Sequence, residues 1–211
     1  MTDEYNTNDG EQEAWVMLQD LDPQLVKKRT LAGSSGSESF SLMCLGRKLD
    51  INPAERSITG DSREAELLLQ DLGSYTRLSV LRYLVHCPDE PLHNEWIKPA
   101  SIPGGRIFDQ GTHVLPLNEP AALIQKNPGA AKKACAGLGG HLQDMGDLSM
   151  VLYPMPRFPV LFIFWYGDEE FSPAGSILID ALWQSHLPID IIWAAAKLSF
   201  EMLLKLLKQY I

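Results

Sequence analysis

The chain contains few cysteines, and this scarcity excludes two classes of protein. Only three of its 211 residues are cysteine, at positions 44, 87 and 135. Their odd number and wide spacing argue against the disulfide framework of a small secreted domain. The spacing also lacks the Cys-x-x-Cys pattern that many iron–sulfur and zinc sites use. We therefore expect reduced thiols in a cytoplasmic protein, and the polar, acidic N-terminus, which has no secretory signal, supports that localisation.

Basic residues and long apolar runs are also scarce. The chain has 18 Lys and Arg against 27 Asp and Glu, a net charge of -9, and no basic residue precedes Lys27. Because an acidic surface repels phosphate backbones, we expect no nucleic-acid partner. The longest unbroken apolar run, Val160 to Tyr166, is much shorter than the roughly 20 residues that cross a bilayer. We therefore expect no membrane span.

What the sequence does contain is enough apolar material for a folded core. Hydrophobic residues make up 45% of the chain and charged residues 21%, as in globular proteins. Residues 1–10 are acidic and lack apolar periodicity, so we expect a flexible N-terminal arm there. We expect residues 11–211 to form a single globular domain, because a chain of this length can bury one core.

Helical periodicity predicts most of the secondary structure. Apolar residues recur at helical spacing from Arg63 to Cys87, with a break expected at Gly73. A helix from Glu119 to about Ala136 should be interrupted at Pro128. Other helices are expected from about residue 11, and over 23–32, 173–185 and 189–210, the last with a wide apolar surface.

Alternating or wholly apolar segments predict strands between these helices. The alternation from Phe40 to Cys44 resumes after a turn at 46–48, which predicts a hairpin. Strands are also expected at 150–153 and 160–166, and the second is apolar on both faces, so it should lie centrally. The segments together predict an α+β fold, in which a small, mostly antiparallel sheet is packed by several helices, including a long apolar C-terminal helix.

One block of residues carries a family resemblance. It is the run Trp165-Tyr166-Gly167-Asp168-Glu169-Glu170-Phe171. It is accompanied by Ile177-Leu178-Ile179-Asp180, Leu187-Pro188-Ile189-Asp190, Leu45-Gly46-Arg47, Pro103-Gly104-Gly105, Gly139-Gly140 and Pro156-Arg157-Phe158-Pro159. From about Trp15 to its end, the chain resembles the family called domain of unknown function 3786. Members of that family are found mainly in anaerobic bacteria and archaea, and some relatives carry an iron–sulfur-type cysteine region. The resemblance implies a fold and a habitat, and it brings no reaction or catalytic residues.

The acidic turn in this block is the first candidate site. Asp168, Glu169 and Glu170 follow a predicted buried strand and precede a predicted helix. Crowded carboxylates can hold a cation or act as general acid and base, because like charges raise one another's pKa. The structural alternative is that these carboxylates cap the N-terminus of the following helix, a position where negative charge is stabilised.

Asp180 is the second candidate, because it interrupts the apolar run from Ile177 to Leu182. A buried carboxylate requires a partner. Arg157 and Arg106 are the candidates for that partner, and a buried ion pair would lock the bend at 154–159 to the helix expected at 173–185.

The histidines provide the last candidates. None of the five has the His-x-x-x-His spacing of a metal-binding helix, and a Cys/His site would need ligands from distant segments. We therefore assign no metal ligands and no particular cofactor. His113 and His141 are candidates for a cleft in which they would meet the acidic turn or Asp180, beneath the long, Pro- and Gly-rich segment 88–120.

Three functions are open at this point. Because no familiar catalytic motif is present, the first is an accessory protein that binds a small-molecule ligand or cofactor; the family's habitat suggests a tetrapyrrole, a corrinoid or an iron–sulfur-related role in anaerobic metabolism. The second is a carboxylate-dependent enzyme that uses the acidic turn 168–170. The third is a protein-interaction module whose apolar C-terminal helix binds a protein partner.

Overall fold

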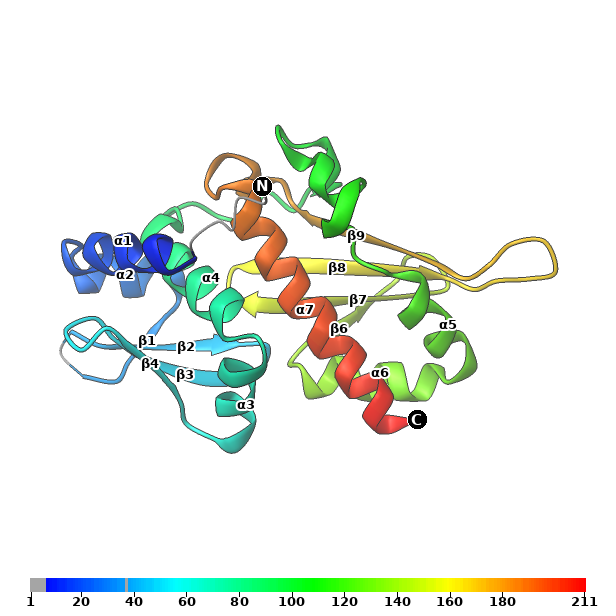
Figure 1. The fold of residues 1–211 in the computed structure, drawn as a ribbon, viewed down its shortest axis with the longest axis horizontal. Coiled ribbons are helices and arrows are strands. Elements are labelled where there is room, and N and C mark those ends of the chain that lie inside the picture. Colours follow the sequence, from blue (N-terminus) through cyan, green and yellow to red (C-terminus); the bar gives the residue numbers. More distant parts are fainter. Residues whose placement is uncertain (1–6, 37) are drawn as a thin grey trace.

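The computed structural model describes residues 7–36 and 38–211, which form seven α-helices and two sheets (Figure 1). The first sheet has the strand order β1-β2-β3-β4, and the second has the order β5-β9-β8-β7-β6. All neighbouring strands are antiparallel. The predicted α+β class is therefore confirmed, with its antiparallel pairing and long C-terminal helix, although the strands form two sheets instead of one.

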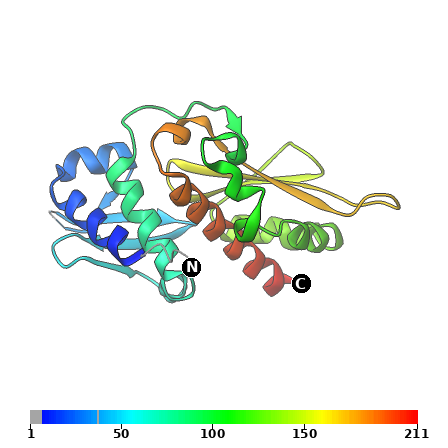
Figure 2. The same ribbon diagram turned by 45° about the horizontal axis from the view of Figure 1, so that its top comes forward.

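The first sheet forms from the N-terminal part of the chain. Its strands are β1 (Gly33–Ser34), β2 (Phe40–Cys44), β3 (Arg47–Asn52) and β4 (Ser57–Gly60). The predicted hairpin is confirmed as β2 and β3, in which Leu42 lies opposite Leu49. Both views show the first two helices, α1 (Thr7–Gln19) and α2 (Pro23–Thr30), above one face of this sheet (Figures 1 and 2).

Helix α1 begins earlier than the sequence predicted. Its first residues, 7–10, belong to the segment that we expected to be a flexible arm, and residues 1–6 lie outside the described part of the chain. Asp22 explains the start of α2, because its side chain accepts the backbone N–H of Gln24 and a proline occupies the first turn.

Two consecutive helices follow the first sheet, and the second of them connects the N-terminal helices with the C-terminal helix. The break expected at Gly73 is confirmed, since α3 (Arg63–Asp71) ends before it and α4 (Gly73–His86) begins with it. Ser62 caps α3 by accepting the backbone N–H of Ala65. Helix α4 is buried along most of its length, and it packs against both α1 and the C-terminal helix.

The second sheet contains β5 (Trp96–Ile97), β6 (His141–Gln143), β7 (Leu148–Met155), β8 (Phe158–Trp165) and β9 (Ala174–Asp180). Strand β8 is the middle strand, and its residues from Phe158 to Phe164 are all buried. Its predicted central position is therefore confirmed. A strand that is apolar on both faces needs cover on each face: its side chains pack in the main core on one face and in a small apolar cluster on the other.

Three helices pack against one face of this sheet (Figures 1 and 2). They are α5 (Asn118–Lys126), α6 (Pro128–Gly137) and α7 (Ile189–Tyr210). The interruption expected at Pro128 is confirmed, and Asn127 caps α6 by accepting the N–H of Ala130. The apolar residues of α7 from Ile191 to Leu207 are buried, so the wide apolar surface of this helix packs in the core.

The prediction of a helix at 173–185 is wrong. This segment is strand β9, followed by the short 3-10 helix η4 (Ala181–Ser185). Ile177 and Ile179 are β-branched, which favours a strand, and both are buried toward the helices. Strand β9 pairs with β8 from Ala174 to Ile179 and with β5 at Ile179 and Asp180, so its backbone groups toward β8 are paired.

The segment before α5 contains three more 3-10 helices. They are η1 (Pro99–Ser101), η2 (Gly105–Phe108) and η3 (Gly111–His113).

One connected cluster of buried apolar residues includes side chains from both sheets, as a single domain requires. The division of the chain into an arm, 1–10, and a domain, 11–211, stays a prediction. Within the described ranges, none of the helices combines the length and apolar composition that a membrane crossing requires.

The two sheets meet at the β2–β3 turn, and this contact provides a test of the fold. Gly46 has a φ of 74°, and a Cβ at this position would lie 3.0 Å from the backbone nitrogen of Gly139. We expect Gly46→Ala to lower the free energy of unfolding by about 2 to 4 kcal/mol, because the left-handed strain of about 1 to 2 kcal/mol adds to the displaced backbone.

Gly111→Ala is the matched control for this prediction. Gly111 also has a positive φ, of 83°, but no atom lies within 4 Å of its Cβ position. This variant should therefore lose only the strain of about 1 to 2 kcal/mol. Urea denaturation measures both losses, and equal losses would contradict a packing role for Gly46.

Candidate functional site

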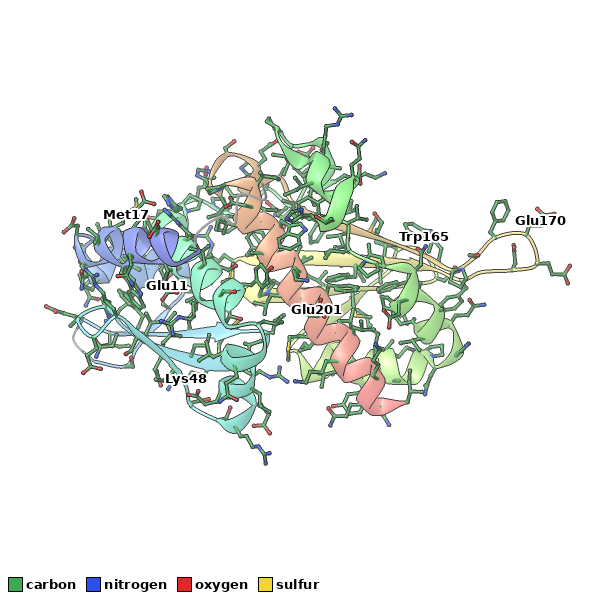
Figure 3. All side chains as sticks on the ribbon, in the orientation of Figure 1. Glu11, Met17, Lys48, Trp165, Glu170 and Glu201 are labelled. Atoms are coloured by element: carbon green, nitrogen blue, oxygen red, sulfur yellow. The ribbon has the colours of Figure 1, made fainter. Side chains whose placement is uncertain are left out.

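The acidic turn lies at the tip of the β8–β9 hairpin, which projects from the body of the molecule (Figure 3). Asp168 Oδ1 accepts the backbone N–H groups of Glu170 and Phe171, both at 2.8 Å. The bonds from Phe171 and Glu170 lower the pKa of the Asp168 carboxyl, because they stabilise its charged form. The helix-capping interpretation is wrong, since no helix follows, and Asp168 caps the hairpin turn instead.

The other side chains of this turn point into solvent. Glu169 and Glu170 are exposed, and Phe171 is 69% exposed. A shallow recess at the tip is lined by residues 167–173 together with Gln125, and none of these residues is a histidine. The structure therefore does not bring the acidic turn together with His113 or His141.

The base of the hairpin is anchored by two residues that the sequence did not indicate. Gln125, on α5, donates its side-chain N–H to the carbonyl of Gly167 at 2.9 Å and accepts the Gly167 N–H at 3.0 Å. Asp147 accepts the N–H of Tyr166 at 2.7 Å. These bonds fix the direction in which the hairpin leaves the sheet.

Asp180 is buried, with 2% of its surface exposed, and its partners are backbone amides. Its Oδ1 atom accepts the N–H groups of His93 and Leu182, each at 3.0 Å, and Oδ2 accepts that of Asn94 at 2.7 Å. Three N–H donors satisfy a buried carboxylate without a cation. The prediction that Asp180 forms an ion pair with Arg157 or Arg106 is therefore wrong.

Arg157 lies in the β7–β8 turn and donates to carbonyl oxygens. Its guanidinium bonds to the carbonyls of Arg29 at 2.7 Å and Pro88 at 2.8 Å, and it also donates to the carbonyl of Glu90. Arg29 lies in the last turn of α2, where carbonyls need donors. Arg157 thus has a structural role. Arg106 is exposed on η2, away from Asp180's hydrogen bonds.

The two candidate histidines lie on different elements. His113 is the last residue of η3. Its ring packs edge-on against Trp193 with 4.8 Å between centroids, and its carbonyl accepts the Trp193 N–H at 2.7 Å. His141 is on β6, and its ring stacks on Tyr153 at 5.9 Å. His141 and Asp180 line the same cavity, so they are one pair of predicted residues that the structure does bring together.

A cavity of about 450 Å³ lies between the segment 98–118 and β9. We call it the edge cavity. Its apolar wall includes Phe108, Leu115 and Ile177, and its polar groups come from Lys98, Asp109, Asn118 and Ser176. Strand β5 places this segment, because Ile97 pairs with Ile179 and so brings the next residues beside β9.

A second cavity, of about 320 Å³, lies on the sheet face opposite the helices. We call it the outer-face cavity, and it contains Asp180, His141, Trp96 and Tyr153. Sequence reasoning missed Trp96 and Lys98 because they lie in a segment without periodicity. The Trp96-Ile97 pair, one aromatic and one β-branched residue between Pro- and Gly-rich stretches, was the available signal for a short strand.

The described residues include no group of three or more His, Cys, Asp or Glu side chains that could hold a metal ion. The three thiols are buried. Burial raises the pKa of Cys44 to about 12 and that of Cys135 to about 11, so both are protonated at neutral pH. This chemistry suits packing rather than nucleophilic attack.

The fold and its cavities define an α+β protein in which a five-stranded antiparallel sheet carries a ligand-sized cavity at one edge and another on its outer face. The family described as "Domain of unknown function (DUF3786)" matches residues 22–202. The chain belongs to this family, which confirms the resemblance that the acidic block indicated. No curated protein and no solved structure matches the chain.

The hydrogen bonds of Asp180 make a prediction about stability. In Asp180→Asn one acceptor oxygen becomes an N–H₂ donor, which then faces a backbone N–H donor. We expect the free energy of unfolding to fall by about 2 to 4 kcal/mol, as for other buried donors that lose their acceptor. Asp144→Asn is the matched control, because Asp144 is exposed. If both variants unfold at the same urea concentration, the carboxylate does not stabilise the fold.

Proposed function

We propose that the protein is an accessory ligand-binding protein and that its ligand occupies the edge cavity. The observation that carries this proposal is the cavity itself. Its volume of about 450 Å³ lies within the roughly 300 to 1,000 Å³ typical of small-molecule sites. Such sites combine apolar walls with a few polar groups that orient the ligand, which is the composition of this lining.

The lining favours a ligand with an apolar body and an anionic group. Phe108, Leu115 and Ile177 offer apolar contacts. Lys98 supplies the cation for a carboxylate, and Ser176 can donate a further hydrogen bond. Asp109 also lines the cavity, so the anionic group of the ligand should lie toward Lys98 and away from this carboxylate.

Tetrapyrroles and corrinoids are the finer classes that we propose. Both combine an apolar macrocycle with polar edge groups, and the family's anaerobic setting supports them. The cavity would cover one edge of such a ring. Because no cysteine lines it, an iron–sulfur-related role would involve a partner enzyme rather than a cluster bound here. A cytoplasmic location is part of the same proposal.

The two other functions have less support. The carboxylates of the acidic turn are exposed, and no histidine lines the recess around them. General acid–base catalysis needs a group positioned against a bound substrate, and this recess is shallow. The apolar residues of α7 between Ile191 and Leu207 are buried against the rest of the chain, which leaves little apolar surface on this helix for a protein partner.

Binding of anilinonaphthalene sulfonate tests the edge cavity, because this dye combines an aromatic body with an anion. We expect saturable binding to the wild-type protein, measured by fluorescence. Lys98→Glu should weaken binding by about tenfold or more, since it replaces an attraction by a repulsion. Ser176→Trp should abolish it by filling the cavity.

Lys132→Glu is the matched control for the charge change, because Lys132 is exposed on α6 outside the cavity lining. It should bind the dye as tightly as the wild-type protein does. If Lys98→Glu and Lys132→Glu bind equally well, the dye does not occupy the edge cavity and the proposed site is wrong.

An absorption spectrum tests the finer classes. Protein purified without oxygen from a host that makes tetrapyrroles and corrinoids should show a visible absorption band, because both macrocycles are coloured. Ser176→Trp, purified in the same way, should lack that band. A colourless wild-type protein would contradict both classes, and the dye experiment would still decide whether the cavity binds smaller anions.

A further inference from the structure

The outer-face cavity is built from one face of the second sheet. Side chains of a strand alternate between the two faces, and directly paired residues share a face. Trp96 pairs with Asp180, and His141 pairs with Val151, two residues before Tyr153. Trp96, Asp180, His141 and Tyr153 line the same cavity together with Pro159 of β8, so all five strands contribute to it.

A small apolar cluster marks this face as separate from the main core. Val151, Leu161 and Ile163 are buried together there, with Trp96 and Tyr153 packed against them. The aromatic side chains therefore have one side on the cluster, and both remain partly exposed at the cavity. The ring of His141 stacks on that of Tyr153 with 30° between their planes. Aromatic side chains thus line the cavity, and the buried cluster of Val151, Leu161 and Ile163 supports them.

The charge of this cavity is negative. Asp180 is a buried carboxylate in its lining, and neither Lys nor Arg contributes to that lining. In the described part of the chain, Asp180 has no ion pair with a basic side chain and is held by backbone N–H groups. The side-chain oxygens of Asn94 and Gln143 add neutral acceptors.

We propose that the outer-face cavity binds a small organic cation that carries a methylated ammonium group. Aromatic faces attract cations at short range. A nearby carboxylate attracts a cation as well, and this attraction acts over a longer distance. An anion would be repelled by Asp180. A metal ion needs several oxygen, nitrogen or sulfur ligands, and the described residues include no cluster of three His, Cys, Asp or Glu side chains. The volume of about 320 Å³ suits a compact ligand.

Choline and its neutral carbon isostere test this proposal, because the two molecules have the same shape and differ in charge. Titration calorimetry of the wild-type protein should show that choline binds at least about tenfold more tightly than the isostere. Equal affinity for the two molecules, or no binding of choline, would overturn the proposal.

Trp96→Leu locates the site, and it leaves the hydrogen bonds of Asp180 in place. This variant should bind choline about tenfold more weakly than the wild-type protein, because it keeps an apolar side chain but loses the aromatic face. Trp165→Leu is the matched control. Trp165 is on the same face of β8 as Leu161 and Ile163, is 43% exposed, and lies outside the cavity lining.

Trp165→Leu should bind choline as the wild-type protein does, and equal weakening by both variants would contradict binding in this cavity. The proposal is independent of the edge cavity. Choline binding should persist in Ser176→Trp, because Ser176 lines only the edge cavity of the two. Failure of one proposal therefore leaves the other unaffected.

Discussion

The burial of strand β8 on both faces is the constraint on which the rest of the C-terminal half depends. Phe162 and Phe164 on one face are buried in the main core, and Leu161 and Ile163 on the other form part of the small cluster. Burial of apolar surface stabilises the fold by roughly 25 cal/mol per Å². A strand that is apolar on both faces therefore contributes its full stabilisation only when both faces are removed from water. Helices α5 to α7 cover the first face. Side chains from the neighbouring strands cover the second, and the incomplete cover there leaves the outer-face cavity.

Two charged side chains, the buried Asp180 and the partly buried Arg157, hold the segment 88–95 against this sheet by bonding to its backbone. Asp180 accepts two of the segment's N–H groups, and Arg157 donates to two of its carbonyls. Neither charge needs the other, because backbone dipoles satisfy each of them. The segment leads directly into β5, so these bonds determine where Trp96 and Lys98 lie. Both cavities therefore depend on the same anchoring.

Local signals predicted much of the fold. The β2–β3 hairpin, the breaks at Gly73 and Pro128, and the central position of β8 all follow from turn residues or short-range periodicity. The segment that forms β9 was wrongly predicted to be a helix. Its run Ile177 to Leu182 is short and apolar, and such a run fits a buried strand as well as a helix until its pairing partners are known. Those partners are β8 and the two-residue β5, and β5 has no periodicity to reveal it.

The candidate sites show the same limit, because they depend on register. The meeting of His141 with Asp180 requires the pairing of β6 with β7, β7 with β8, and β8 with β9. A shift of one residue in any of these pairs would turn a side chain to the other face. The burial of Asp180 was predictable from its apolar neighbours, but its partners were not, because backbone amides leave no trace in the sequence. A buried acidic residue beside a strand end therefore does not imply a basic partner when a neighbouring loop can supply N–H groups.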